Sequence, residues 1–384
     1  MARVKSGQII FAAILAIFVY GMIAVMLGTI LPSFEFTPDQ AGKIALAQAL
    51  GLILASLAAG PLVDNKGKKV ALVAGLGLIA VALFLLANAP REVTAVGIYL
   101  FVLGFGGGML VTSANALASD VNEERRASTL NFLNLFFGLG GLATPFVAAN
   151  LLGGDAVRIA YAAAILTAAV FLVHVFTPMP PPSGERGFKT AEVGLVLGRP
   201  ALWLLSLFLF LYVACEVGVW NWLATYLNKA RGIQKDTALN ILSLGFALGM
   251  LIGRVVISRV LIRISAVTVT LGSAVAMAVT TWAMLQTSDP VMAAVAVFCA
   301  GLAMAPVFPT TLAMVGDAFP VASATAMGIV ITFGWIGLAV SSVIIGSIGG
   351  GDDTRLGTAL LVLPVFSVLM IGVNLILRPM LHRA

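Results

Sequence analysis

Hydrophobic residues occur along this chain in long runs, separated by short polar stretches that hold most of the charges. Each run is about 20 residues long, the length that an α-helix needs to cross a hydrocarbon layer roughly 30 Å thick. A transmembrane β-barrel would instead show short segments of alternating polarity. The pattern predicts twelve membrane-spanning helices, at approximately residues 8–31, 40–63, 70–88, 95–119, 127–149, 157–177, 201–227, 237–258, 265–286, 290–316, 322–347 and 356–377.

The composition supports an all-α polytopic membrane protein. Of the 384 residues, 60% are hydrophobic and only 10% are charged, and the mean hydropathy is +1.08. A soluble domain of this size would not stay dispersed with so few charges. The connections between the runs are mostly short, which leaves no room for a soluble catalytic domain.

The basic residues predict the orientation of the chain. Most of the 22 lysines and arginines fall on one side of the membrane if the N-terminus is cytoplasmic. By the positive-inside rule, we expect a multi-pass protein of the cell (inner) membrane with both termini in the cytoplasm. Basic loops beside anionic lipid also account for the net charge of +6, so the charge gives no reason to expect a nucleic-acid partner.

The residues that carry catalysis or bind metals are scarce. The two cysteines, Cys215 and Cys299, both fall inside predicted spans, and the two histidines, His174 and His382, have no metal-ligand spacing. The glycine run "GFGGGM" (104–109) lies inside a span, where glycines allow close helix packing. We therefore expect no enzyme activity, no metal and no cofactor.

The longest polar interruption, "TPMPPPSGERGFKTAEVGLVLGRP", lies near the middle of the chain at residues 177–200. Its proline cluster cannot continue a helix. It predicts an N-terminal six-helix bundle at residues 1–177, a cytoplasmic linker at 178–199 and a C-terminal six-helix bundle at 200–384. An internal repeat agrees with this division, because "FFGLGGLAT" (136–144) resembles "TFGWIGLAV" (332–340) at the corresponding place in the second half.

The loop between the second and third spans reads "GPLVDNKGKKVAL" (60–72). It resembles the signature of the major facilitator superfamily in that loop, and parallel six-helix repeats are typical of the same superfamily. The matching residues are Gly60, Leu62, Asp64, Gly67, Lys68 and Lys69. The resemblance implies an inner-gate latch in which Asp64 meets a helix end of the other half. "GRVVISR" (253–259), with Arg254, is a degenerate copy of this loop that lacks the aspartate.

One acidic residue, Glu216, lies at the centre of a predicted span. A carboxylate at that depth costs roughly 2.5–3.5 kcal/mol on insertion scales, so such residues usually serve a function. Residues four apart share a helix face, which places Tyr212, Glu216 and Trp220 on one stripe. Aromatic rings beside a carboxylate suit a sugar, which has a C–H face and a rim of hydroxyl groups. With the adjacent Asn221, these residues are candidate substrate ligands, and we expect the helix to loosen near Gly218.

"YVACEVGVWNWLATYL" (212–227) is similar to the seventh span of the fucose-permease branch of sugar symporters, which also contains glucose/galactose permeases. Further resemblances to this branch lie in "FPT" (308–310), "LNFLNLFFGLG" (130–140) and "TSAN" (112–115). The acidic residues that take part in proton coupling in fucose permease correspond approximately to Gly28 and Val111 in this chain. Three alternatives follow: Glu216 carries the coupling proton, the coupling cation is Na⁺, or the protein is a uniporter.

Other polar side chains inside the spans are candidates for the lining of a substrate cavity. They are Asn131, Asn134, Gln48, Tyr20, Thr332 and Trp335. Each of them could instead form a hydrogen bond to a neighbouring helix, as polar side chains in membranes commonly do.

Together these observations predict a secondary transporter, acting as a monomer, that imports a neutral hexose-like sugar by alternating access. Coupling to H⁺ or Na⁺ is expected. No basic residue is central in a span, so a charged substrate would find no counter-ion. The alternative is a multidrug or metabolite efflux antiporter of the same fold, because a buried acid among aromatic rings also suits amphipathic cations.

Overall fold

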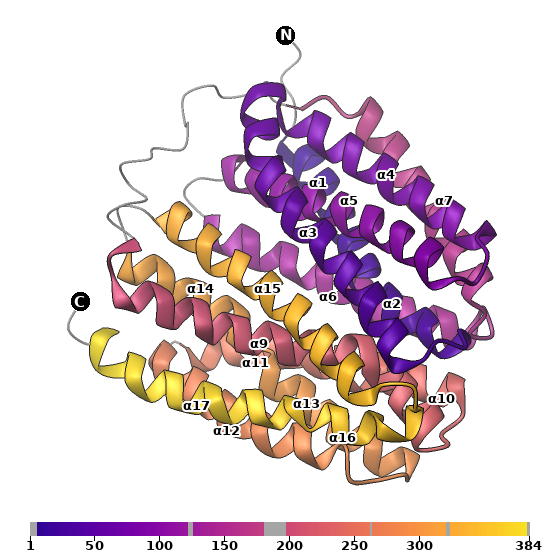
Figure 1. Ribbon diagram of the computed structural model, residues 1–384. Coiled ribbons are helices and arrows are strands. Elements are labelled where there is room, and N and C mark those ends of the chain that lie inside the picture. The colour runs from indigo at the N-terminus through magenta and orange to yellow at the C-terminus, as the bar shows by residue number, and fades with distance from the viewer. Residues whose placement is uncertain (1–5, 122–125, 180–196, 262, 320–322, 382–384) are drawn as a thin grey trace. The chain divides into compact units, whose positions relative to one another are not determined.

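The computed structural model describes residues 6–121, 126–179, 197–261, 263–319 and 323–381, and over these residues the regular structure is entirely helical (Figure 1). The chain divides into two compact units. The N-terminal unit comprises residues 1–36 and 43–187, and the C-terminal unit comprises residues 37–42 and 188–384. Most of the predicted linker, residues 178–199, lies outside the described residues.

The helices of the first half are long and joined by short connections. They are α1 (Ser6–Ala24), α2 (Met26–Ile30), the 3₁₀ turn η1 (Leu31–Ser33), α3 (Pro38–Lys66), α4 (Lys68–Asn88), α5 (Val93–Val121), α6 (Arg126–Asn150) and α7 (Ala156–Phe176).

The second half contains more interruptions, including two π-helical segments, η3 and η4. Its elements are α9 (Pro200–Thr225), η3 (Tyr226–Ala230), α10 (Lys235–Asn240), η4 (Ile241–Ala247), α11 (Leu248–Val260), α12 (Ala266–Ala283), α13 (Pro290–Met304), α14 (Val307–Ala318), α15 (Ser323–Gly349), η5 (Asp353–Arg355), α16 (Leu356–Leu360) and α17 (Val362–Leu381).

The predicted class of fold is confirmed: this is an all-α polytopic membrane protein. Within the described part of the chain, 11 helical segments are long and apolar enough to cross a bilayer. The 29-residue helix α3 covers the remaining predicted span, 40–63. Large apolar side chains such as Phe84, Ile165 and Val279 are exposed, as expected where the surrounding solvent is lipid.

Backbone contacts at glycines hold the N-terminal unit together. Helix α4 packs against both α5 and α7 (Figure 1). Helices α3 and α5 approach closely, because a Cβ at Gly51 would overlap the carbonyl oxygen of Phe101 and a Cβ at Gly104 would overlap that of Gln48. Substituting either glycine would therefore force the two helices apart.

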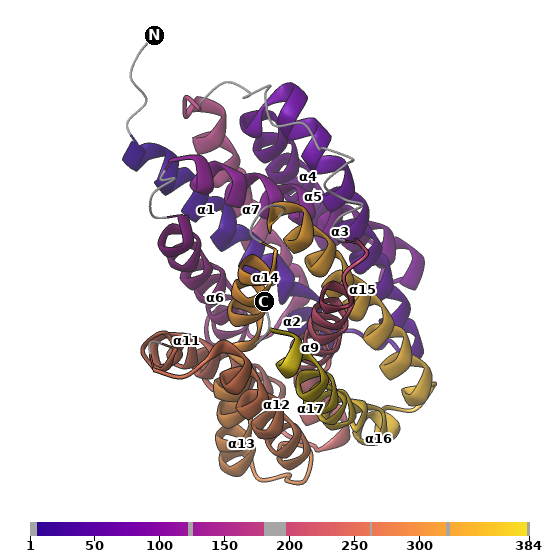
Figure 2. The ribbon, with the colours of Figure 1, turned by 90° about the vertical axis from the view of Figure 1, so that its left-hand side faces the viewer.

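The C-terminal unit packs around α9. Helix α15 runs alongside α9 (Figure 1), and Gly337 lies against the carbonyl group of Phe210. Helix α12 packs between α13 and α17, with α11 beside α13 (Figure 2). The predicted span 290–316 is broken between α13 and α14 at Pro306, whose nitrogen cannot donate to the helical hydrogen-bond ladder. Helix α9 packs against α15, α17 and α14, and most of its residues are buried.

Candidate functional site

Tyr212, Glu216 and Trp220 occupy successive turns of α9, as their spacing predicts. All three are buried, with 0%, 9% and 5% of their surfaces exposed. The indole Nε1 of Trp220 donates a hydrogen bond to Glu216 Oε1 at 3.4 Å. The carboxyl group therefore has a polar partner on its own helix, although it lies within an apolar bundle.

A second aromatic ring fixes the position of the indole. Phe246 packs edge-on against Trp220, with ring centroids 4.8 Å apart and planes at 78°. Phe246 belongs to the π-helical segment η4, and such segments occur often at functional sites. The indole is thus held by a hydrogen bond on one side and an edge-to-face ring contact on the other.

A basic residue acts on the same carboxyl group. The guanidinium of Arg254, on α11, interacts electrostatically with Glu216 and with Tyr212. The sequence predicted that no basic side chain would reach the centre of a span, and Arg254 was assigned to the inner-gate loop copy. Arg254 thus adds an opposite charge within electrostatic range of Glu216, which reduces the cost of placing a carboxylate in the bundle.

Several buried polar atoms in this region lack a well-aligned hydrogen-bond partner among the described residues. They are Tyr212 Oη, Asn221 Oδ1, Trp222 Nε1, Thr225 Oγ1 and Thr310 Oγ1. The Tyr212 hydroxyl is near enough to Glu216 to act on its carboxyl group, but it lacks the geometry of a formed hydrogen bond. Buried polar atoms are normally paired, so unpaired ones mark places where a ligand or water can bind. This set contains both donors and acceptors, and it consists of uncharged groups.

Helix α9 does not loosen at Gly218, contrary to the expectation from the sequence. The helix is continuous from Pro200 to Thr225, and the π-helical turn begins only at Tyr226. A Cβ at position 218 would meet the side chain of Leu363 on α17. Gly218 therefore serves close packing between helices.

In the N-terminal unit the candidate residues make contacts between helices. Gln48 on α3 is buried, and its Nε2 donates to the carbonyl oxygen of Ile23 on α1 at 3.3 Å. The ring of Tyr20 lies 5.3 Å from that of Phe137 on α6. Asn134 is half-buried on α6, and the side chain of Asn131 lies outside the described residues. Gln48 and Tyr20 thus contribute to packing, and their role in binding stays a prediction.

Thr332 and Trp335 lie on α15, next to α9. The hydroxyl of Thr332 donates to the carbonyl oxygen of Gly328 within its own helix at 2.8 Å, and Trp335 is half-buried. The structure places both residues in the same unit as Glu216, and the contacts it gives them do not include the Tyr212–Glu216–Trp220 stripe.

Five of the six residues of the predicted inner-gate latch lie at or near the turn between α3 and α4, and the sixth, Arg254, lies on α11. Gly67 has a φ of +88°, which confirms the need for glycine in this turn. Lys68 is buried, and Lys69 Nζ donates to the carbonyl oxygen of Val175 near the end of α7 at 2.7 Å. Gly60 and Asp64 belong to α3, and their surroundings lie outside the described part of the structure, so the latch stays a prediction.

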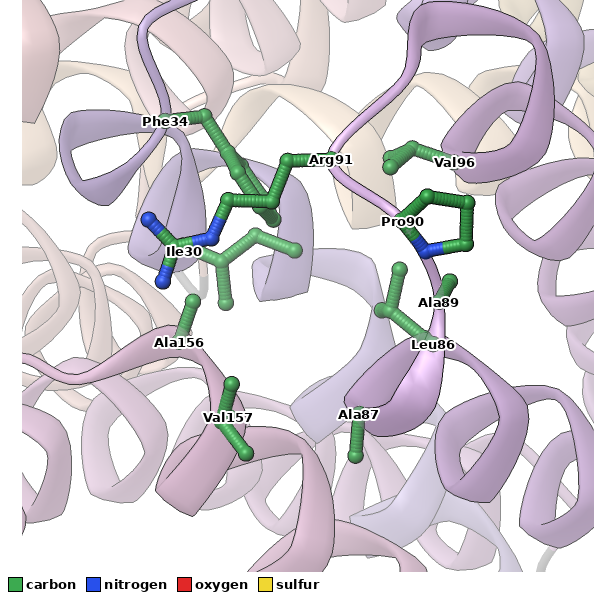
Figure 3. Close-up of a pocket in the computed structure, with 10 residues that line it drawn as sticks. All are labelled: Ile30, Phe34, Leu86, Ala87, Ala89, Pro90, Arg91, Val96, Ala156 and Val157. Carbon is green, nitrogen blue, oxygen red and sulfur yellow. The ribbon is translucent and has the colours of Figure 1, made fainter.

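A small cavity lies in the N-terminal unit, and Figure 3 shows its lining. Its volume is about 20 Å³, enough for about one water molecule. Phe34 and Arg91 flank it, with the guanidinium 6.0 Å from the ring centroid. None of the predicted substrate ligands lines this cavity. Among the described residues, no cluster of His, Cys, Asp or Glu could hold a metal ion.

The sequence pattern of the Major Facilitator Superfamily matches residues 9–245, which is more than half of the chain. The chain belongs to this superfamily. Relatives of this chain that carry a functional name include transporters of sugars, 4-hydroxybenzoate and niacin.

Comparison with individual superfamily members shows several kinds of transported solute. The chain is 24% identical over 320 residues to the glucose/mannose transporter GlcP of Bacillus subtilis, covering 77% of each protein. It is 32% identical over 152 residues to the 4-hydroxybenzoate transporter PcaK of Pseudomonas aeruginosa, covering 38% of this chain and 33% of PcaK. The matches to the first four curated relatives span between 29% and 55% of those proteins' lengths.

A solved structure, that of a mutant of the nucleoside transporter NupG, superposes on this chain with a TM-score of 0.81. The sequences are 15% identical, and the superposition covers 97% of this chain and 99% of NupG. At this identity the likeness shows the superfamily fold alone. Sequence reasoning did not assign Phe246 to the site; it contacts Trp220 from the eighth predicted span, residues 237–258.

Proposed function

We propose that this protein imports a neutral hexose-like sugar by alternating access, with cation coupling through Glu216. The observation that carries the proposal is the buried Glu216–Trp220 pair on α9, in which a carboxyl group and an aromatic ring adjoin on one helix face. A pyranose packs its C–H face on an indole and donates hydroxyl protons to a carboxylate. The proposed ligands are Glu216, Trp220, Tyr212 and Asn221.

The unpartnered polar atoms support a polyhydroxylated substrate. Tyr212 Oη can donate or accept, and Asn221 Oδ1 accepts. A hydroxyl group can also both donate and accept, so it can pair with any of these atoms. A sugar analogue that lacks one hydroxyl group would leave one of these buried atoms unpaired, so the site should bind that analogue much more weakly.

The charges also favour a substrate without net charge. Arg254 lies within electrostatic range of Glu216, so the two charges partly offset each other within the C-terminal unit. A neutral sugar leaves that electrostatic balance unchanged. The similarity to GlcP is in keeping with this choice, because it extends over 77% of both chains.

Cation coupling follows from the position of Glu216. A carboxyl group that touches the substrate can hold a proton while the substrate binds and release it on the other side of the membrane. We therefore propose H⁺ as the coupling cation, with Na⁺ as the alternative that the same oxygen ligands would allow.

An organic carboxylate is the second candidate substrate, and Arg254 is the observation that favours it. The Arg254 guanidinium lies within electrostatic range of Glu216 and has a buried Nε, and a guanidinium can bind a carboxylate in a bidentate manner. The 32% identity to a 4-hydroxybenzoate transporter over 152 residues points in the same direction.

Uptake by purified protein in proteoliposomes separates the candidates. Labelled glucose, galactose and fucose should accumulate when a proton gradient is imposed, and 4-hydroxybenzoate and a cationic dye should not. Replacing the proton gradient with a Na⁺ gradient identifies the cation. Accumulation of 4-hydroxybenzoate with no hexose uptake would instead assign the carboxylate function, and dye extrusion would assign efflux.

A further inference from the structure

His174 is a buried titratable residue in the N-terminal unit that the proposed transport site does not use. It lies in the last turn of α7 and is fully buried. Its Nδ1 is 2.8 Å from the carbonyl oxygen of Val170 on the same helix, and its Nε2 is 3.0 Å from the carbonyl oxygen of Ala12 on α1. The imidazole therefore joins α7 to α1, two helices that pack against each other.

Both ring nitrogens of His174 face groups that only accept hydrogen bonds. A neutral imidazole has one N–H and one nitrogen with a lone pair, whereas the imidazolium has two N–H groups. The neutral form can therefore donate to only one of the two carbonyl groups, and its other nitrogen then faces an oxygen lone pair. The observed pair of contacts is fully satisfied only when His174 carries a second proton.

Loss of that proton weakens the contact between the helices in either neutral form. If the hydrogen stays on Nδ1, Nε2 has nothing to donate to Ala12. If it stays on Nε2, the repulsion is between Nδ1 and Val170, which one rigid helix holds close together. Only a rotation of the ring relieves that repulsion, and the rotation also moves Nε2 away from Ala12.

Few titratable groups lie on α7 and on the helices that pack against it, α1, α2 and α4. Over the described residues they are Tyr20 on α1, Lys68 and Lys69 on α4, and Arg158 and Tyr161 at the other end of α7, with none on α2. Lys69 is the one that acts on the imidazole. Its Nζ donates to the carbonyl oxygen of Val175, the next residue after His174, at 2.7 Å.

The surroundings of His174 act on its charge in opposite directions. Burial and the Lys69 ammonium oppose the imidazolium, and the two carbonyl oxygens favour it. The C-terminal end of a helix also favours a cation. The described segments of these four helices contain no Asp or Glu that would hold the proton permanently. Histidine is the side chain whose charge ordinarily changes near neutral pH.

We propose that His174 is a proton-dependent link between α1 and α7. When the imidazole takes a proton from water, it donates to both Val170 and Ala12 and holds the two helix ends together. When it returns the proton to water, the bond to Ala12 is lost and the ends separate. In the predicted orientation this end of α7 faces the cytoplasm, so the link responds to cytoplasmic pH. It involves no residue of the proposed sugar site.

Nuclear magnetic resonance of ¹⁵N-labelled histidine tests the protonation. His382→Gln leaves His174 as the only histidine of the chain. We expect two protonated ring nitrogens at about pH 5 and one at about pH 8, the range in which histidine changes charge. An imidazole that stays in one protonation state across this range would overturn the proposal.

Spin labels test the movement of the helices. Phe11 on α1 and Phe176 on α7 are 56% and 80% exposed, so cysteines at these positions accept labels once the two native cysteines are replaced. The distance between the labels should increase with pH over the same interval as the loss of the proton. His174→Gln cannot titrate and should remove this change. A distance that is constant in the wild type, or that changes equally in His174→Gln, would contradict the link.

Lys69→Gln keeps the histidine and removes the ammonium that opposes its charge. Both the loss of the proton and the change in distance should therefore move to higher pH. Lys66→Gln is the matched control, because Lys66 is an exposed lysine at the end of α3, near the same turn. It should leave both transitions in place. If His174→Gln folds poorly, the Lys69 variant decides: transitions that do not move together would refute the proposal.

Discussion

The indole nitrogen of Trp220 and a carboxylate oxygen of Glu216 are 3.4 Å apart, one turn along the same helix, and Phe246 fixes the indole from η4. This hydrogen bond is long compared with the usual 2.9–3.0 Å, so it is weak. A carboxylate has about four acceptor positions, of which the indole uses one. The pair therefore orients the carboxyl group and leaves it able to accept hydrogen bonds from a substrate.

Trp220→Phe tests the contribution of the indole. The new ring can still pack against Phe246, but it cannot donate to Glu216. A weak hydrogen bond contributes about 0.5–1 kcal/mol. We expect hexose affinity to fall by about threefold, with little change in melting temperature. Isothermal titration with the sugar measures this effect.

Trp203→Phe is the control for that substitution. Trp203 is 45% exposed, and its Nε1 donates to the carbonyl oxygen of Leu197 at 2.9 Å. It should bind sugar like the wild type. If both variants lose affinity equally, the effect of Trp220 is on the fold and not on the ligand.

Tyr226 and Arg231 join the end of α9 to the end of α12. Tyr226 Oη donates to the carbonyl oxygen of Leu285 at 2.8 Å, and Arg231 donates to both Tyr226 Oη and Leu285. We expect Tyr226→Phe to lower the free energy of unfolding by about 1 kcal/mol, because Arg231 loses an acceptor. A double-mutant cycle with Arg231→Gln should show coupling; additive effects would mean that the two side chains act independently.

Asp155 caps the N-terminus of α7 and should make stability depend on pH. The backbone N–H of Arg158 donates to Asp155 Oδ1 at 2.9 Å and holds the pKa of this carboxyl below its ordinary value of 3.8. A depressed folded-state pKa stabilises the protein above the unfolded-state pKa, and this stability is lost as the pH falls through the folded-state value.

Asp155→Asn keeps a capping oxygen but cannot titrate, whereas Asp155→Ala removes the cap at a cost of about 1 kcal/mol. Melting temperatures between pH 7 and pH 3 should show the wild type losing its advantage over Asp155→Asn at the acidic end. A constant difference across this range would show that the charge does not contribute.

Gly104→Ala tests the close approach of α3 and α5. The added methyl group would overlap the carbonyl oxygen of Gln48, so the helices must separate. Overpacking of this kind costs about 1–3 kcal/mol. Gly272→Ala, in open space on α12, should be neutral or slightly stabilising. Melting temperatures of the two variants provide the comparison, and similar values would refute the close contact.

The fold could be predicted because a bilayer requires each span to satisfy its own backbone hydrogen bonds. The lengths of the apolar runs therefore predicted the helices, including α3 at Pro38–Lys66. The Tyr212–Glu216–Trp220 stripe could also be predicted, since it depends only on the period of one helix. The break at Pro306 lies within a continuous apolar run, which hides it from a hydropathy argument.

The neighbours of the stripe could not be predicted, because they depend on how a second helix is rotated. The π-helical segment η4 precedes α11 and changes the angular position of every residue after it. Arg254, which the sequence suggested for the gate loop, lies within electrostatic range of Glu216. The contact of His174 with Ala12 likewise depends on tertiary packing: His174 is fully buried, with its ring nitrogens 2.8 and 3.0 Å from the carbonyl oxygens of Val170 and Ala12.

The measurement that tests the account most directly compares concentrative uptake with counterflow of labelled hexose in proteoliposomes that contain Glu216→Gln. The amide is nearly isosteric and still accepts from Trp220, but it cannot carry a proton. The variant should fold like the wild type and exchange sugar across the membrane, and it should fail to accumulate sugar under an imposed proton gradient. Accumulation equal to that of the wild type, with the same dependence on pH, would show that Glu216 does not couple transport to protons.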